Sequence, residues 1–252
     1  ALPILTAAGG GKDNAIPVES SAQVVASDEA AARQAAEQMA AALTREYAVA
    51  DPGLRVEVTA CEVSETPMDR ASTEKALCML TCLPNGVQAM SMDIPGLVQT
   101  SLNLGILATE ADSLTATFCV RSSLGSQKEM LHRRLRALMA QLGGTVSISG
   151  DYPAWEYRQD SPFRDLMTEI FWEQYGSAPQ IEAIHAGVEC GILAGKLPGL
   201  DCVSVGPDLL DIHTPRERMD IASVQRVWRF VLEVLKRSKY GQGRGRGRAP
   251  LF

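Results

Sequence analysis

Hydrophobic periodicity in the first 150 residues switches between the spacing of strands and that of helices. Apolar and polar residues alternate over 54–63, which predicts a half-buried strand, whereas the alanine-rich stretch 29–47 has helical spacing. In all, the pattern predicts strands at 2–8, 22–26, 54–63, 97–109, 114–122 and 145–149, and helices at 29–47, 72–82 and 126–142. This is an α+β arrangement, with helices on a mostly antiparallel sheet.

Local signals mark the ends of several of these elements. Ser27 or Asp28 is suited to cap the first helix, and Gly143-Gly144 is suited to end the third. The four residues from Glu110 to Ser113 form a plausible hairpin turn between the two long strands.

The pattern changes after residue 150. Helices at 163–175, 190–196 and 222–238 alternate with short apolar strands at 180–184 and 202–205, which is typical of α/β units with parallel strands. We therefore expect one domain over 1–149 and a second over 150–240. Residues 241–252 begin with a glycine–arginine alternation that cannot build a core, and we expect this tail to be disordered.

Composition narrows the class of partner. The chain is 46% hydrophobic and 21% charged, as in ordinary globular proteins, and its net charge of −6 argues against nucleic acid as the main partner. RNA binding through the Gly-Arg tail stays open as a weaker alternative. No apolar run approaches the ~20 residues that span a bilayer, so no membrane partner is expected. The six cysteines form no Cys-x-x-Cys pair, which favours buried free thiols in a reducing cytoplasm.

The three histidines can be weighed individually. His132 lies beside two arginines in a helix and is expected at the surface. His185 ends an apolar strand, with Glu189 at the following helix start, and is either structural or functional. His213 is the strongest candidate ligand, since it follows a Gly-Pro turn and precedes Thr-Pro, in a loop that Glu217 and Arg218 can orient.

One histidine does not make a metal centre. Catalytic zinc takes three protein ligands, and a two-zinc site needs about five including a bridging carboxylate. The sequence contains no His-x-Asp, His-Glu-x-x-His, His-x-x-Glu-His or Glu-Glu motif. The chain alone is therefore not expected to build a dinuclear centre.

Three segments in order carry a resemblance to a known family. They are Gly150-Asp151-Tyr152-Pro153-Ala154-Trp155, then Ile184-His185-Ala186-Gly187-Val188-Glu189-Cys190-Gly191, then Ser204-Val205-Gly206-Pro207 with Asp211-Ile212-His213-Thr214-Pro215-Arg216-Glu217-Arg218. Together they resemble the C-terminal catalytic segment of the aminoacyl-histidine dipeptidases, or peptidase D. These are two-zinc metallopeptidases related to carboxypeptidase G and the succinyl-diaminopimelate desuccinylases.

The resemblance implies a role for each part of the chain. Residues 1–149 would be a lid domain, incomplete at its N-terminus and similar to a dimerisation domain, and residues 150–240 the C-terminal portion of the catalytic domain. A glycine-rich element that ends in Asn14-Ala15-Ile16-Pro17 and the paired strands near 98–104 and 120–123 are similar to lid elements. The remaining metal ligands and the general base would lie upstream, so no catalytic residue is expected in this chain.

The resemblance also implies roles for five side chains. His213 would be the last zinc ligand, and Arg121 would hold the substrate carboxylate. Asn14 would reach the substrate or the neighbouring subunit's site, and His185 and Glu189 would line the substrate pocket. Structural roles stay open for two of them: Arg121 can pair with an acid on the sheet, and Asn14 can satisfy a turn. Packing is favoured over substrate stacking for Tyr152 and Trp155.

The function implied is that of a C-terminal portion of a cytoplasmic, metal-dependent dipeptidase. It would hydrolyse Xaa-His-type dipeptides with water activated by two zinc ions, manganese and cobalt being open as alternatives. The expected partners are a dipeptide substrate, the missing N-terminal half and, as an open possibility, a second copy in a homodimer. The isolated chain is expected to be inactive. The alternative is a non-catalytic, lid-like binding or dimerisation module.

Overall fold

A computed structural model describes residues 2–62, 66–183, 189–212 and 214–241. The chain divides into two compact units. Unit 1 comprises Ala1–Gln88, Ser101–Val120 and Lys128–Ile148, and unit 2 comprises Ala89–Thr100, Arg121–Gln127 and Ser149–Phe252. Each unit is described separately below.

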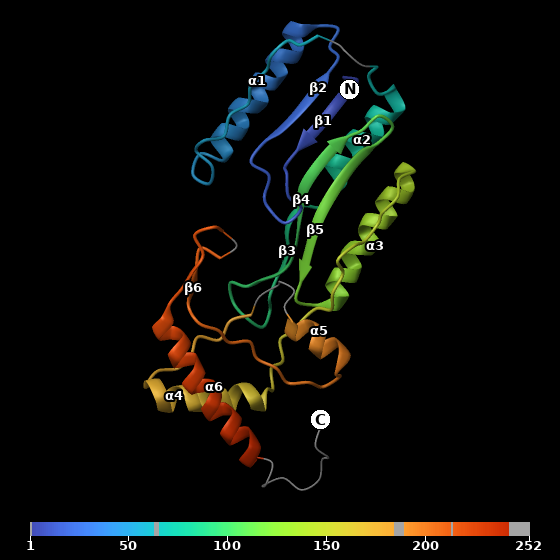
Figure 1. Ribbon diagram of the computed structural model, residues 1–252. Helices are drawn as coiled ribbons and strands as arrows, with labels where there is room; N and C mark the ends of the chain where they lie inside the picture. The colour runs from blue at the N-terminus through green and yellow to red at the C-terminus, as the bar shows by residue number, and fades with distance from the viewer. Residues whose placement is uncertain (1, 63–65, 184–188, 213, 242–252) are drawn as a thin grey trace. The chain divides into compact units, whose positions relative to one another are not determined.

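The main sheet has five strands, four of them in the order β2-β1-β4-β3 (Figure 1). The fifth, β5, also pairs with β4. The strands are β1 (Ile4–Gly9), β2 (Ser20–Val24), β3 (Gly86–Met90), β4 (Val98–Thr109) and β5 (Leu114–Ser122). The β1–β2 and β1–β4 pairs are antiparallel, and the amide of Glu110 donates to the Ser113 carbonyl at 2.8 Å in the turn after β4. The predicted α+β character of this region is confirmed.

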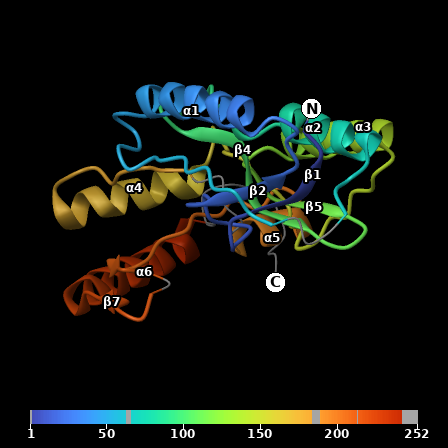
Figure 2. The same ribbon diagram turned by 90° about the horizontal axis from the view of Figure 1, so that it is seen from above.

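Three helices lie along one face of this sheet (Figures 1 and 2). They are α1 (Glu29–Glu46), α2 (Arg70–Cys82) and α3 (Gly125–Leu142). Asp28 caps α1 as predicted, its carboxylate accepting from the Ala31 amide at 3.0 Å, and Gly143 ends α3 with a φ of 75°. Both helix ends are determined by residues adjacent in the sequence, which is why they can be predicted from the sequence.

Two small apolar clusters form the core of unit 1. Ile4, Ala7 and Ala76 join β1 to α2, and Leu102, Leu131 and Leu135 join β4 to α3. His132 is also buried, at 8% exposure, so its predicted surface position is wrong. It lies next to Leu131 on the face of α3 that packs into the unit, and its Nδ1 is 3.9 Å from a Glu129 carboxylate oxygen.

Several predicted strands are absent from the described residues. Residues 54–62 form no strand, with Val56 and Val58 exposed, and 145–149 form none either. In the first case the Val58 carbonyl accepts a hydrogen bond from the Arg33 guanidinium at 2.7 Å rather than from a neighbouring strand. Alternation alone does not make a strand, because the backbone also needs a partner. Strand β3, by contrast, was not predicted.

Unit 2 is built on two packed helices, α4 (Pro162–Tyr175) and α6 (Ile221–Gly241). Its core contains Met167, Ile170, Phe230 and Val234. It also contains α5 (Glu189–Lys196) and a short antiparallel pair, β6 (Leu209–Leu210) with β7 (Arg218–Met219). All three helices were predicted. Neither 180–183 nor 202–205 is a strand in the described structure, and no parallel pair occurs among the described strands of this unit.

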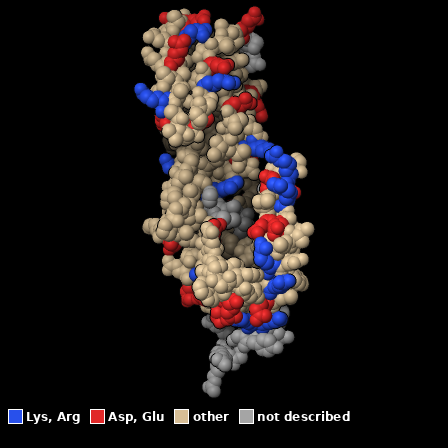
Figure 3. All heavy atoms as spheres, turned by 90° about the vertical axis from the view of Figure 1, so that its left-hand side faces the viewer, with Lys and Arg blue, Asp and Glu red and all other residues tan. Residues whose placement is uncertain are grey.

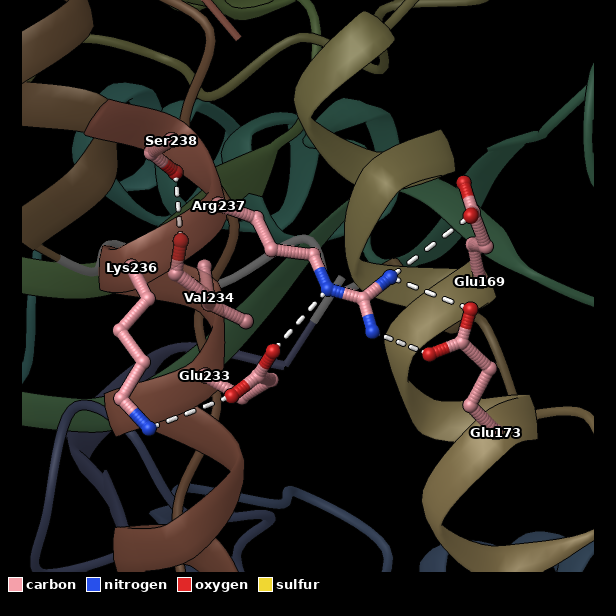
Figure 4. A network of polar contacts seen from close by, with 7 residues as sticks. All are labelled: Glu169, Glu173, Glu233, Val234, Lys236, Arg237 and Ser238. Carbon is pink, nitrogen blue, oxygen red and sulfur yellow. Dashed lines mark hydrogen bonds and ion pairs between the residues drawn. The ribbon is translucent and has the colours of Figure 1, made fainter. Parts of the chain in front are cut away.

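An ion-pair network joins α4 to α6 around Arg237 (Figure 4). The guanidinium contacts Glu233 on its own helix at 3.1 Å and reaches across to Glu169 and Glu173 on α4. These contacts lower the pKa of Glu173 and of Glu233 and raise that of Arg237. The network therefore holds together the two helices that carry the core of unit 2.

Three further findings bear on the sequence predictions. Among the described residues, no helix is both long and apolar enough to span a membrane. All six cysteines are free, as predicted, but Cys61 and Cys82 are exposed and the other four are half-buried, so their predicted burial is wrong. On the face drawn in Figure 3, acidic and basic side chains lie interspersed. The predicted disorder of the tail falls on 242–252, outside the described residues.

Candidate functional site

Arg121 lies near the end of β5, where its backbone is held by a buried pair of hydroxyls. Thr100 Oγ1 and Ser122 Oγ are 2.9 Å apart, and Ser122 Oγ also donates to the Leu124 carbonyl at 2.9 Å. The Ser123 amide donates to the Gln99 carbonyl at 3.0 Å. These bonds fix the end of the strand immediately after Arg121.

The Arg121 guanidinium has no hydrogen bond or ion pair with another side chain in the described part of the chain. Its residue is half-buried, and none of the described acids lies within ion-pair distance. The structural alternative, an ion pair with an acid on the sheet, therefore finds no support among these residues. A guanidinium with free donors on a half-buried residue is suited to hold a carboxylate through two parallel hydrogen bonds.

Asn14 lies at the tip of a turn over 12–15 that packs directly on β4. Asn103 Nδ2 donates to the Asp13 carbonyl at 3.3 Å and to the Ala15 carbonyl at 2.7 Å. Gly105 faces the same turn, and a Cβ placed there would lie 2.3 Å from the Asp13 carbonyl oxygen. Asn103 thus satisfies the turn, which leaves the exposed Asn14 amide with no hydrogen bond to any described residue.

Asn103 and Gly105 were not identified from the sequence as supports of this turn. A signal was present, since an amide and a glycine interrupt an otherwise apolar strand. What the sequence lacked was the partner, because the turn is about 90 residues upstream.

Glu189 is the first residue of α5 and is exposed. The helix is held against the segment before α4 by two glycines. A Cβ on Gly191 would lie 2.9 Å from the Pro153 carbonyl oxygen, and one on Gly195 would lie 2.8 Å from the Pro153 ring. Trp155 contributes to the same contact with its Cβ 3.4 Å from that Gly191 position, in agreement with a packing role.

His213 lies outside the described residues, but the loop on both sides of it is described. Asp211 adopts a left-handed φ of 54°, and its carbonyl accepts a hydrogen bond from Thr214 Oγ1 at 2.7 Å. Arg218 forms an ion pair with the Asp211 carboxylate at 3.0 Å, which agrees with the expectation that Arg218 orients the loop. The loop that carries His213 is thus closed on itself, at the β6–β7 pair.

The structure therefore places only three of the five predicted site residues, and these three lie in different units. Arg121 and Glu189 belong to unit 2, and Asn14 belongs to unit 1. His185 and His213 lie outside the described residues. Among the described residues, no group of three or more His, Cys, Asp or Glu side chains is arranged to hold a metal ion.

A hollow of about 680 Å³ opens in unit 2. Its walls come from 154–158, from α4 and α6, and from the irregular segments 179–183 and 199–206. Aromatic and aliphatic residues dominate the lining, among them Trp155, Phe171, Ile181, Val203 and Phe230. Two arginines also line it: Arg164 stacks over the Tyr157 ring at 4.8 Å and Arg158 donates to the Gly199 carbonyl at 3.0 Å.

The fold of the chain agrees with that of a solved dipeptidase structure. A solved structure, the aminoacylhistidine dipeptidase from Vibrio alginolyticus, superposes with a TM-score of 0.83 at 29% identity, over 93% of this chain and 48% of that one. The resemblance indicated by the sequence motifs is thereby confirmed.

A curated relative gives the same result. The chain is 30% identical over 230 residues to the cytosol non-specific dipeptidase of Escherichia coli strain K12, a match that covers 90% of this chain and 47% of the relative. The chain thus spans about half the length of the proteins it matches. No family model matches it.

Proposed function

We propose that this chain is the C-terminal portion of a metal-dependent, cytoplasmic dipeptidase that hydrolyses Xaa-His-type dipeptides. The observation that supports this most is the superposition of 93% of the chain on an aminoacylhistidine dipeptidase. The matched proteins are about twice as long, so the remainder of the enzyme would be contributed by an upstream polypeptide.

The metal centre is proposed for the assembled enzyme. The described residues do not by themselves fit a metal ion, since no three potential ligands come together among them. His213 is proposed as the last ligand, and the other ligands and the general base would come from upstream. Two zinc ions, or manganese or cobalt in their place, would supply an activated water to such a site. The chain by itself is proposed to be inactive.

Within this chain, Arg121 is proposed to bind the C-terminal carboxylate of the dipeptide. Three observations support this role: the residue is half-buried, its guanidinium is unpaired among the described residues, and its strand end is fixed by the Thr100–Ser122 hydroxyl pair. A pre-positioned guanidinium loses little freedom when it binds a planar anion.

Asn14, His185 and Glu189 are proposed to contact the substrate. For Asn14 the support is its free amide on a turn that Asn103 already satisfies. For Glu189 it is an exposed carboxylate at the start of a helix fixed by Pro153. His185 shares the Glu189 motif, which is the only support for its role.

The hollow in unit 2 is proposed to receive part of the upstream polypeptide. Its walls include 180–183 and 202–205, which have the apolar sequence of strands but no strand partner among the described residues. Ile181 and Val205 are each 48% exposed. Strands from the missing half would pair with these segments and cover their apolar side chains, which would convert them into the predicted α/β layer.

A second candidate, a dimerisation module, is supported by one feature of unit 1. Strand β2 is an edge of the sheet, and all five of its residues are exposed. Exposed edge strands are templates for pairing with another chain. A homodimer through this edge is compatible with the dipeptidase proposal and is also the function expected if the chain has no upstream half.

Reconstitution from two polypeptides tests the proposal. The chain and the polypeptide encoded upstream of it would be co-expressed, supplied with zinc, and assayed on an Xaa-His dipeptide such as alanyl-histidine. We expect hydrolysis only when both are present, and loss of both activity and bound zinc in His213→Ala. Arg216→Ala, a change of an exposed side chain in the same loop, would control for loop disruption by retaining zinc. A complex that assembles with zinc but hydrolyses no dipeptide would favour the module.

A further inference from the structure

Two thiols lie next to one another on the outer part of α2. The Sγ atoms of Cys78 and Cys82 are 4.0 Å apart, with Cys82 exposed and Cys78 half-buried. They are four positions apart, so their side chains lie one turn apart on a single face of the helix. Neither residue belongs to the dipeptidase motifs.

The spacing of this thiol pair is set by a well-anchored helix. Asp69 caps α2 by accepting from the Ser72 amide at 2.7 Å. On the opposite face Thr73, Ala76 and Met79 are buried in unit 1. Because the backbone is fixed at both the cap and the buried face, the two sulfurs differ in position only through their own χ1 rotations.

The separation of the sulfurs matches that of two thiolates on one metal ion. Metal–sulfur bonds of about 2.3 Å place two thiolates about 3.8 Å apart at a tetrahedral angle and about 4.6 Å apart when collinear. The observed 4.0 Å lies between these limits, and a collinear complex would need the sulfurs to move about 0.6 Å further apart, which small χ1 rotations allow.

The coordination number selects the kind of ion. No third His, Cys, Asp or Glu in the described structure joins this pair in a metal-binding group. Ions that require three or four protein ligands are expected to bind weakly to a site with two. Thiolates favour soft cations, and among biological ions monovalent copper is soft and accepts two sulfur ligands.

The position at the end of the helix favours a cation as well. Cys82 is the last residue of α2, where the unpaired carbonyl groups carry partial negative charge. The hydrogen bond between the two thiols raises the pKa of Cys78. An ion that binds both sulfurs as thiolates must displace the thiol protons.

We propose that Cys78 and Cys82 form a two-thiol binding site for a soft, two-coordinate cation, of which monovalent copper is the probe. Two thiols and one Cu⁺ give a bis-thiolate complex and release two protons, with no change in oxidation state. This site does not depend on the dipeptidase proposal, because neither sulfur has a part in it.

Titration of the full chain with Cu⁺ against a chromogenic copper chelator tests the site. We expect Cys78→Ser and Cys82→Ser each to lose the same single equivalent of tightly bound Cu⁺. Cys61→Ser removes an exposed, unpaired thiol and is the matched control, expected to retain that equivalent. Circular dichroism would establish that each variant is folded.

The pH dependence gives a second, independent measurement. Because two protons are released, the association constant is predicted to rise about 100-fold per pH unit, against about 10-fold when binding releases one proton. A 10-fold slope, or an equivalent that survives in Cys78→Ser, would overturn the proposal. So would a disulfide between the two cysteines, detected as two fewer titratable thiols after the ion has been removed with the chelator.

Discussion

The hydroxyl of Ser161 donates a hydrogen bond of 2.7 Å to the carboxylate of Asp201, which lies 40 residues further along the chain. The same carboxylate accepts from the Phe163 amide at 3.0 Å, and Ser161 Oγ accepts from the Arg164 amide at 3.1 Å. Two backbone amides in the first turn of α4 thus find acceptors: one in Ser161, just before the helix, and one in Asp201, in the segment after α5. This ties the 199–206 wall of the hollow in unit 2 to α4, which lines the same hollow.

Replacement of Ser161 by alanine is expected to destabilise unit 2. The change removes the cap of α4 and leaves Asp201 without its hydroxyl donor, and the loss of such a cap costs about 0.5–2 kcal/mol. Chemical denaturation of Ser161→Ala against the parent would measure it. Ser204→Ala changes an exposed serine of the same unit that caps none of the described helices, and this variant is expected to unfold at the parent's midpoint. Equal midpoints for all three proteins would contradict the proposed importance of the cap.

Replacement of Gly105 by alanine is expected to displace the turn that carries Asn14. The new Cβ would lie 2.3 Å from the Asp13 carbonyl oxygen, and backbone must move to relieve that contact. We expect a loss of about 1–3 kcal/mol in the free energy of unfolding, as for other overpacked sites. Gly11→Ala is the matched control, because a Cβ at Gly11 has no neighbour within 4 Å. A Gly105→Ala protein as stable as Gly11→Ala would show that the turn does not pack on β4.

The Arg237 network predicts a specific pH dependence of stability. Its carboxylates Glu173 and Glu233 have pKa values lowered from the ordinary 4.5, so the folded state binds their protons less readily than the unfolded state. The stabilisation is therefore fully present above about pH 4.5 and is lost as the pH falls through the lower, folded-state values.

Arg237→Met removes the charge and keeps most of the side chain. We expect its melting temperature to be a few degrees below the parent's at pH 7, with the difference shrinking as the pH falls below 4.5. Arg229→Met, an exposed arginine on the same helix, should follow the parent at every pH. A difference for Arg237→Met that is independent of pH would mean that packing, and not the charge, stabilises the helix pair.

If Arg121 holds the substrate carboxylate, its removal affects binding more than turnover. In the reconstituted enzyme, Arg121→Gln is expected to raise KM for a dipeptide about 10- to 100-fold, in the range of charge-assisted hydrogen bonds. The same variant should discriminate little between a dipeptide and its C-terminal amide, whereas the parent should prefer the free acid. Arg134→Gln, an exposed arginine on α3, serves as the control. An unchanged preference for the free acid would remove Arg121 from the site.

The sequence was informative where structure depends on neighbours along the chain. The helices α1, α2, α4 and α6 and the strands β4 and β5 lie within a few residues of their predicted positions. Periodicity and capping residues such as Asp28 are local signals, and a helix satisfies its own backbone.

The sequence was misleading where structure depends on a distant partner. Residues 54–62 have the alternation of a strand, but Arg33 and not a strand contacts the Val58 carbonyl. For 180–183 and 202–205 the apolar pattern is present and the pairing partner is not among the described residues. The same holds for the candidate site. The motifs pointed to Asn14, but they did not show that Asn103, far along the chain, donates hydrogen bonds to the turn around it.

The 12–15 turn is held through its main chain, so its side chains can be replaced without loss of these contacts. Both Asn103 and Gly105 meet the turn at main-chain atoms, its carbonyls and the Asp13 Cα, whereas the side chains of Lys12, Asp13 and Asn14 are exposed. The shape of the turn is therefore largely independent of which residues occupy it. Mutation or laboratory evolution can vary these three positions, and with them the chemistry presented at the tip, at little risk to folding.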